Sequence, residues 1–148
     1  MTKNIAKDFQ QPLTRIEGKE EWKVKIYANL KRMREYISKN NTRLEEEKLI
    51  QDKLHRKLNE SKQKTFGWMK KQAEEARLDE ILPQESNQKK SAGSIGKTMV
   101  LNSTYLVSKE DRENFARVVR FLEKEYKSMG LSFESTGPKV PYNFLSAK

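Results

Sequence analysis

The sequence predicts an α+β protein, and three observations lead to this class. Residues 21–27 alternate between apolar and polar side chains, which is the pattern of a strand. Residues 30–76 consist largely of Lys, Glu, Gln, Arg and Leu, which favour a helix. Residues 99–135 contain two β-rich segments separated by a segment with helical spacing. A chain of 148 residues is long enough for one domain with its own core, so we expect a single domain.

Residues 21–27 predict a half-buried strand. One face carries the apolar residues Trp22, Val24 and Ile26. The opposite face carries Lys23, Lys25 and Tyr27. This arrangement leaves one side of the strand in water. Residues 1–19, which precede the strand, show no sustained period, and we expect them to form a flexible N-terminal arm. Asn29, which follows it, can cap the next helix.

The middle of the chain, about residues 30–78, predicts an amphipathic helical arm. A break near residues 40–42 divides it, and Asn41 or Thr42 can cap the second helix. The apolar positions of the second helix are Ile50, Leu54, Leu58, Phe66, Met69, Ala73 and Ala76. Because these positions are sparse, we expect the arm to lie at the periphery of the domain. Residues 83–97 are polar and contain Gly, Ser and Pro, so they predict a linker.

Residues 99–135 predict a β-α-β unit, which we expect to be the stable core. Residues 99–107 carry apolar side chains on both faces, as a central strand does. The helix that follows Ser108, its expected cap, has apolar residues at helical spacing: Phe115, Val118, Val119, Leu122, Tyr126 and Met129. Gly130 predicts a left-handed end to this helix, and residues 131–135 predict a short strand. A crossover of this length gives parallel strands in one sheet, with the helix on one face.

Residues 136–145 predict a stiff closing strip after the last strand. Its candidate partner-binding residues are Thr136, Gly137, Pro138, Pro141, Tyr142 and Phe144. Gly137 allows a positive φ or a close approach of the backbone, and each proline fixes its own φ. We expect such a strip to bring the rings of Tyr142 and Phe144 to one place. The rings either close the core of the domain or form a docking surface for a partner, and the two roles are compatible.

The patterns that could carry catalysis are weak. The chain has no Cys and one His, His55, which excludes thiolate metal sites and any site with two His ligands. Residues 91–98 resemble the end of a phosphate-binding loop but begin with Ser91 where that motif requires Gly. A linker precedes them and a strand follows, so their backbone donors would not converge on a phosphate. We expect no catalytic residue, no metal and no cofactor, and therefore not an enzyme.

The net charge of +10 raises the question of a nucleic-acid partner. The only tight basic cluster is Lys31-Arg32-Met33-Arg34, and acidic residues accompany the basic ones along the whole chain. This pattern is more typical of solvated helix faces than of a phosphate-binding groove, and an acidic protein partner is compatible with it. A basic helical nucleic-acid-binding or adaptor module remains the alternative. The chain has neither an apolar run that could span a membrane nor a secretory signal at its start, so we expect a cytoplasmic protein.

The segment from Met99 to Phe144 resembles the end of the gas vesicle protein F/L family (GvpF/GvpL). The residues that carry the resemblance are Val100-Leu101-Asn102, Tyr105-Leu106-Val107, Phe115, Thr136-Gly137-Pro138 and Pro141-Tyr142-Asn143-Phe144. Residues 21–27 look like the first strand of the same domain. Within the closing motif the family tends to have Trp and Pro where this chain has Lys139 and Val140.

The resemblance implies a fold and a role. The implied fold is one GvpF/GvpL C-terminal-like domain, residues 20–148, whose sheet is related to the ferredoxin-like fold and carries the helical arm. The implied role is that of a non-enzymatic accessory protein in gas vesicle assembly. Its implied partners are the hydrophobic shell protein, which it would shield or nucleate, and other accessory proteins of the vesicle. Association with the vesicle itself would follow from these contacts.

Overall fold

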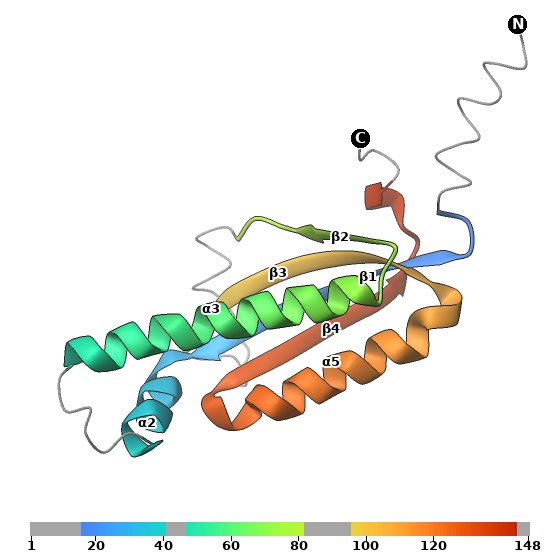
Figure 1. Ribbon diagram of the computed structural model, residues 1–148. Helices are drawn as coiled ribbons and strands as arrows, with labels where there is room; N and C mark the ends of the chain where they lie inside the picture. The colour runs from blue at the N-terminus through green and yellow to red at the C-terminus, as the bar shows by residue number, and fades with distance from the viewer. Residues whose placement is uncertain (1–15, 41–46, 82–95, 145–148) are drawn as a thin grey trace, which may run out of the picture.

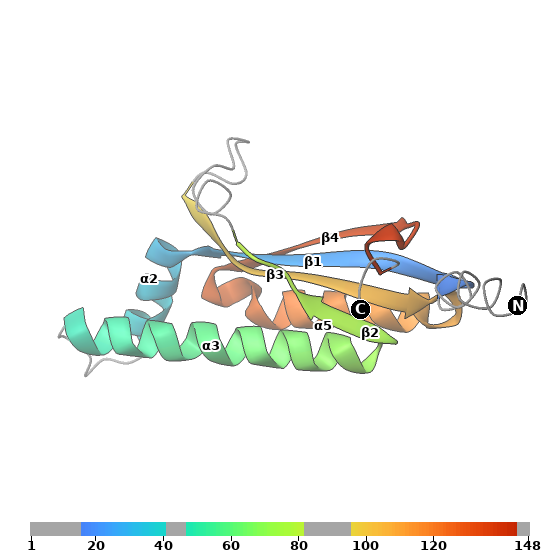
Figure 2. The same ribbon diagram turned by 90° about the horizontal axis from the view of Figure 1, so that it is seen from above.

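The computed structural model describes residues 16–40, 47–81 and 96–144 (Figure 1). The elements in chain order are β1 (Lys19–Asn29), α2 (Leu30–Asn40), α3 (Glu47–Lys71), β2 (Glu75–Leu78), β3 (Lys97–Ser108), α5 (Arg112–Tyr126) and β4 (Leu131–Lys139). The strands form a four-stranded antiparallel sheet in the order β2-β3-β1-β4. Helices α3 and α5 lie along one face of this sheet (Figures 1 and 2). This α+β architecture has a ferredoxin-like strand order and confirms the predicted fold class.

The predicted β-α-β unit is present, but its two strands are not neighbours. Strands β3 and β4 run in the same direction because each pairs antiparallel with β1, which lies between them. Helix α5 connects them across one face of the sheet (Figure 1). Strand β3 has β2 and β1 on its two sides, so the prediction of a central strand is confirmed. The unit is therefore a split β-α-β whose gap is filled by the first strand of the chain.

Strand β1 is longer than the segment that alternates in the sequence. Its apolar positions Val24 and Ile26 are fully buried under the helices, as predicted. The alternation then breaks, because a register shift between Ile26 and Tyr27 leaves three consecutive residues, through Ala28, buried. The side chain of Asn29 accepts a hydrogen bond from the backbone N–H of Arg32 at 3.1 Å, which confirms the predicted helix cap.

The expectation of a peripheral helical arm is wrong. In α3, Leu54 and Ile50 belong to a core cluster with Ile26 of β1, and Met69 belongs to a second cluster around Tyr105. Figures 1 and 2 show α3 running along one face of the sheet. The sequence hides this stripe because two of its members, Ser61 and Thr65, are polar but fully buried. Small side chains at these positions allow the helix to approach the layer beneath it.

The helical arm also ends earlier than expected. Helix α3 stops at Lys71, and residues 75–78 form the edge strand β2 instead of a last helical turn. Three of its pairs with β3 are Glu75 with Leu106, Ala76 with Tyr105 and Arg77 with Thr104. Pairing with the exposed edge of β3 overrides the helical propensity of this segment. The proposed caps Asn41 and Thr42, and most of the proposed linker at 83–97, lie outside the described residues.

The second half of the sheet follows the prediction closely. Phe115 and Leu122 of α5 are fully buried, and Gly130 ends the helical segment with a φ of 106°. A β-carbon at Gly130 would lie 3.2 Å from the backbone oxygen of Asn29, so this turn packs tightly on the start of α2. Ser108 makes no side-chain capping hydrogen bond, because the chain first forms a 3-10 turn at Lys109–Asp111.

Candidate functional site at the closing strip

The first half of the closing strip belongs to the sheet. Strand β4 continues to Lys139, beyond the predicted residues 131–135, and pairs with β1 as far as Glu21. In this pairing Thr136 lies opposite Lys23 and Lys139 lies opposite Glu21. Gly137 and Pro138 therefore face the single residue Trp22, which is the geometry of a β-bulge. The bond between Gly137 and Pro138 is cis.

Gly137 is in direct contact with the ring of Trp22. A β-carbon at position 137 would lie 2.7 Å from Cδ2 of this ring and 2.9 Å from the backbone oxygen of Glu21. The φ of Gly137 is 149°, which side-chain-bearing residues rarely adopt. No other residue fits here without displacing the ring or the strand. The glycine therefore has a structural role, which is to let β4 close over Trp22.

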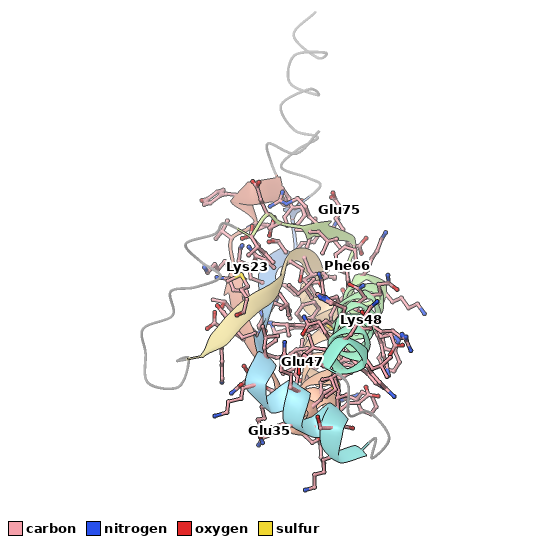
Figure 3. The ribbon with its side chains drawn as sticks, turned by 90° about the vertical axis from the view of Figure 1, so that its left-hand side faces the viewer. Lys23, Glu35, Glu47, Lys48, Phe66 and Glu75 are labelled. Carbon is pink, nitrogen blue, oxygen red and sulfur yellow. The ribbon has the colours of Figure 1, made fainter. Side chains whose placement is uncertain are left out.

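Trp22 connects the strip to an aromatic cluster between the sheet and the helices. Its ring centroid lies 5.6 Å from that of Phe115, and Phe115 meets Tyr105 edge-on at 5.3 Å. Tyr105 in turn lies 6.1 Å from Phe66 of α3, which Figure 3 shows facing the sheet. Rings at these separations stabilise one another beyond the area that they bury. The start of the strip is thus anchored in the main core of the domain.

The second half of the strip separates its two rings. Phe144 is only 3% exposed, and the guanidinium of Arg77 in β2 lies 5.2 Å from its ring centroid. Tyr142 is 69% exposed and Val140 is 59% exposed. The expectation that both rings reach one place is therefore wrong. A 3-10 turn at Tyr142–Phe144, closed by a 3.1 Å bond from the Phe144 N–H to the Pro141 oxygen, directs the rings to different sides.

An open cleft of about 730 Å³ borders the strip. Its walls are formed by Ile16, Glu17, Gly18, Lys19, Glu20, Lys109, Pro138, Lys139, Val140 and Pro141. The strip and the chain that enters β1 therefore form opposite sides of one depression. Lysines and glutamates both line it, so the cleft offers no single sign of charge to a ligand. Val140, one of its exposed apolar members, lies two residues before the exposed Tyr142.

A buried carboxylate at the rim of this cleft is fixed by an ion pair. Arg112 at the start of α5 donates to Glu20 through Nε at 2.8 Å and through its terminal nitrogen. The hydrogen bond from Arg112 holds the pKa of Glu20 below its usual value, although burial acts in the opposite direction. The indole N–H of Trp22 also points to Glu20, at 3.4 Å. This pair fastens β1 to α5 and orients the ring on which Gly137 packs.

A second ion cluster lies on the side of the sheet away from the helices. Asp79, just after β2, accepts hydrogen bonds from Thr104, from Arg77 at 3.1 Å and from Lys23 at 3.4 Å. Burial alone would raise the pKa of Asp79, but these three partners together hold it below its usual value. Figure 3 shows Lys23 on the face opposite Phe66. The cluster ties the edge strand to β3 and β1, which is a structural role.

The other candidates from the sequence do not assemble into a site. His55 is exposed on α3, and within the part of the chain that the structure describes its one polar contact is with Gln51 at 3.2 Å. Within the described ranges, no group of three His, Cys, Asp or Glu side chains could hold a metal ion. Most of residues 91–98, which resemble a phosphate-binding loop, lie outside these ranges. The strand that was expected to follow them is β3, which begins at Lys97. None of the helices in the described ranges has the length and apolarity needed to cross a membrane.

The basic cluster of α2 does not form a continuous charged surface. Met33 at its centre is fully buried in the core. Arg34 is held by Glu47 and Gln51 of α3, so its charge is partly neutralised. Lys31 and Arg32 are the members that stay exposed. Two adjacent exposed cations are by themselves a small positive surface for nucleic acid.

The family comparison agrees with this geometry. The model of the gas vesicle synthesis protein GvpL/GvpF family matches residues 1–146. The chain belongs to this family. The match extends across β1, the helical layer and the closing strip, so the resemblance carried by the C-terminal residues is confirmed for nearly the whole chain. Comparison with curated proteins finds no match.

Two solved structures of the GvpL/GvpF family share the fold. The gas vesicle protein GvpF from Anabaena sp. PCC7120 superposes with a TM-score of 0.69 at 15% sequence identity. The alignment covers 100% of this chain and 62% of that one. GvpF from Microcystis aeruginosa gives a TM-score of 0.66 at 15% identity, with 97% and 61% covered. The chain thus spans about three fifths of the length of these relatives.

Sequence reasoning missed the residues that organise the site from a distance. The Glu20–Arg112 pair joins positions 92 apart in the chain, and the contact of Gly137 with Trp22 depends on a bulge. A glycine between Thr136 and Pro138 does signal a tight approach, but the sequence does not say to which residue. Trp68 and Phe121 were also missed, although each is an aromatic residue outside the buried stripe of its helix.

Proposed function

We propose that this protein is a non-enzymatic accessory protein of gas vesicle assembly. It binds the hydrophobic shell protein, shielding it or nucleating its assembly, and contacts other accessory proteins of the vesicle. The observation that carries the proposal is the family match over residues 1–146, since the family is described as one of gas vesicle synthesis. We place the protein in the cytoplasm, where it would meet the shell protein before assembly.

The chemistry of the described residues supports a binding role. The buried or half-buried carboxylates with lowered pKa values, Glu20 and Asp79, are both paired with cations that join structural elements. Carboxylates in such ion pairs stay ionised and hold structural elements together, so they are not arranged as general acids or bases. What the surface offers instead is exposed apolar side chains, and these suit contacts with another protein.

The closing strip supports the proposal as a docking element. It is anchored at one end by Gly137 on Trp22 and at the other by the buried Phe144. Between these anchors, Val140 and Tyr142 are exposed. A rigid base with exposed apolar side chains loses little conformational entropy when it binds. We infer that Val140 and Tyr142 contact the apolar shell protein, while Thr136, Gly137, Pro138 and Pro141 set the shape of the strip.

Deletion and complementation test the proposal. In a cell that forms gas vesicles with this protein as its GvpF/GvpL-type component, deleting the gene should abolish flotation, and vesicles should be absent from electron micrographs. The wild-type gene should restore both. The purified protein should co-precipitate the shell protein, and bovine serum albumin serves as the unrelated bait. Normal vesicles in the deletion strain, with no second gene of the family present, would overturn the assignment.

A further inference from the structure

Trp68 and Phe121 form an exposed aromatic pair on the helical layer. Trp68 comes from α3 and Phe121 from α5, and their ring centroids are 5.7 Å apart with an interplanar angle of 12°. The two residues are 38% and 54% exposed. Single exposed apolar residues are common on protein surfaces. Two stacked rings from separate helices, in contrast, form one contiguous apolar feature, and aromatic residues are enriched at the centres of protein interfaces.

Exposed cations flank these rings along α3 and α5. Helical spacing places Lys71 one turn after Trp68, and it places Arg117 and Lys124 one turn before and after Phe121. All three are exposed, and none makes an ion pair with any residue in 16–40, 47–81 or 96–144. The basic aromatic patch consists of these five residues: Trp68, Lys71, Arg117, Phe121 and Lys124.

Glu125, an acidic residue beside the patch, is already neutralised by an ion pair. Glu125 binds the ammonium of Lys64 at 2.8 Å, and this ammonium lies 4.8 Å from the centroid of the Trp68 ring. The cation therefore holds the indole in place and takes up the charge of Glu125. Lys71, Arg117 and Lys124, which form no ion pair within the described ranges, keep their charge for a ligand. The patch combines an apolar centre with a positive rim.

We propose that the basic aromatic patch docks an acidic amphipathic helix of a partner protein. An apolar side chain of that helix packs against the two rings, and carboxylates on either side of it pair with Lys71, Arg117 and Lys124. The charge complementarity selects an acidic partner, and the apolar centre selects an amphipathic one. This inference rests on the proposed function, because it names the chemistry of one partner of an assembly protein.

The arrangement of the rings favours a protein over a nucleic acid. Single-stranded nucleic acids bind aromatic platforms by stacking bases on open ring faces. The indole of Trp68 already stacks on Phe121 and carries the Lys64 ammonium over its ring. Both contacts compete with a base for the ring of Trp68. Aliphatic side chains of a helix need no open ring face and can pack against whatever part of the two rings is exposed, so they are the better fit.

A peptide-binding experiment tests the patch. The probe is a fluorescein-labelled amphipathic peptide of about 16 residues, long enough to form helix, with Leu on one face and Glu elsewhere. Its binding to the full chain is measured by fluorescence anisotropy. The W68A/F121A variant and the K71E/R117E/K124E variant should each weaken binding at least about tenfold. The matched control K31E/R32E/K39E changes the net charge by the same amount on α2 and should stay within about twofold of wild type.

Several outcomes would overturn the inference. Folded wild-type protein could fail to bind the peptide, or could bind a scrambled peptide of the same composition equally well. The α2 control could weaken binding as much as the patch variants, which would indicate non-specific electrostatics. Poly-uridine RNA could bind more tightly than the peptide and be lost in the patch variants, which would indicate a nucleic-acid surface. Circular dichroism checks that every variant is folded.

Flotation assays separate this inference from the proposed function. If deletion of the gene abolishes vesicles and W68A/F121A restores them as well as wild type does, the patch has no role in assembly and the inference fails alone. If deletion leaves vesicles unchanged, the proposed function fails. The expected result is that deletion and W68A/F121A both abolish flotation, while K31E/R32E/K39E retains it.

Discussion

The backbone of Gly137 lies against the ring of Trp22, so close that a β-carbon at position 137 would be 2.7 Å from ring atom Cδ2. This contact explains why the strip needs a glycine between a threonine and a proline. The ring of Trp22 is fixed from its other sides by Phe115 and by the side chain of Glu20. It cannot move aside without disturbing the core or a buried ion pair. The closing strip is therefore part of the fold as well as a candidate surface.

Gly137→Ala should destabilise the protein. The added methyl group collides with Trp22, and φ at this position disfavours a side chain, so we expect a loss of about 1–3 kcal/mol. Gly67→Ala is the matched control, because Gly67 lies inside α3 with nothing within 4 Å of the added β-carbon. It should raise stability by about 0.5–1 kcal/mol, as Ala favours a helix. Urea denaturation measures both. Equal effects of the two substitutions would contradict the contact.

Leu54→Ala should cost as much stability as Leu122→Ala. Both side chains are at most 2% exposed, one in α3 and one in α5, and each removal leaves a cavity. We expect a loss of about 2–5 kcal/mol for each. Leu49→Ala is the control, because Leu49 is on α3 but 43% exposed, and its effect should stay within about 0.5 kcal/mol. A small loss for Leu54 beside a large one for Leu122 would show that α3 is peripheral after all.

The sequence predicted those elements whose signal is local. The alternation of β1, the dense apolar spacing of α5 and the left-handed Gly130 all reflect the geometry of one element. The stripe of α3 was misjudged because buried Ser61 and Thr65 have polar side chains. Strand β2 was missed because its residues favour helix and become a strand only by pairing with β3. In both cases tertiary packing decides what local propensity does not.

The candidate site was harder to predict than the fold. The glycine and prolines of the strip indicated a constrained backbone, and the structure agrees. Whether the rings of Tyr142 and Phe144 are buried or exposed depends on a short 3-10 turn, which the sequence does not predict. The stacking of Trp68 on Phe121 requires knowing that α3 and α5 are neighbours. Such relationships between distant elements follow from the topology and not from any one segment.

Phe144→Ala and Tyr142→Ala should separate stability from binding. Phe144 is 3% exposed, so its truncation should cost about 3–5 kcal/mol. Tyr142 is exposed, so its truncation should change stability by less than about 0.5 kcal/mol while weakening co-precipitation of the shell protein. Leu78→Ala, at another exposed apolar residue, should affect neither. Unchanged co-precipitation with Tyr142→Ala would show that the strip has a structural role alone.

His55→Ala and Lys97→Ala should leave vesicle formation intact. His55 is exposed, and Lys97 opens a strand where a phosphate-binding loop would require a helix. Neither position has the surroundings that catalysis requires. Flotation of cells that carry each variant is the measurement, with circular dichroism to confirm folding. Loss of vesicles with a folded variant would revive an enzymatic role. The deletion strain is the reference for complete loss.

The Glu20–Arg112 pair should make stability depend on pH in the acid range. Because the folded-state pKa of Glu20 is lowered, ionised Glu20 stabilises the fold above its unfolded-state pKa. That contribution is lost as the pH falls through the lowered folded-state pKa. Arg112→Ala removes the main cause of the shift and leaves a buried carboxylate without its cation. The variant should therefore be less stable than wild type at neutral pH, and the difference should shrink as the pH falls through the acid range.

Urea midpoints at a series of pH values would measure this difference. Arg117→Ala is the control, since Arg117 lies on the same helix, is exposed and makes no ion pair with the described residues. Its midpoint should follow that of wild type at every pH. A gap between Arg112→Ala and wild type that stays constant from neutral to acid pH would mean that Arg112 acts through packing of its side chain. A difference in urea midpoint that disappears in acid for Arg112→Ala, with no difference for Arg117→Ala, would show that Arg112 stabilises the fold through the charge of Glu20.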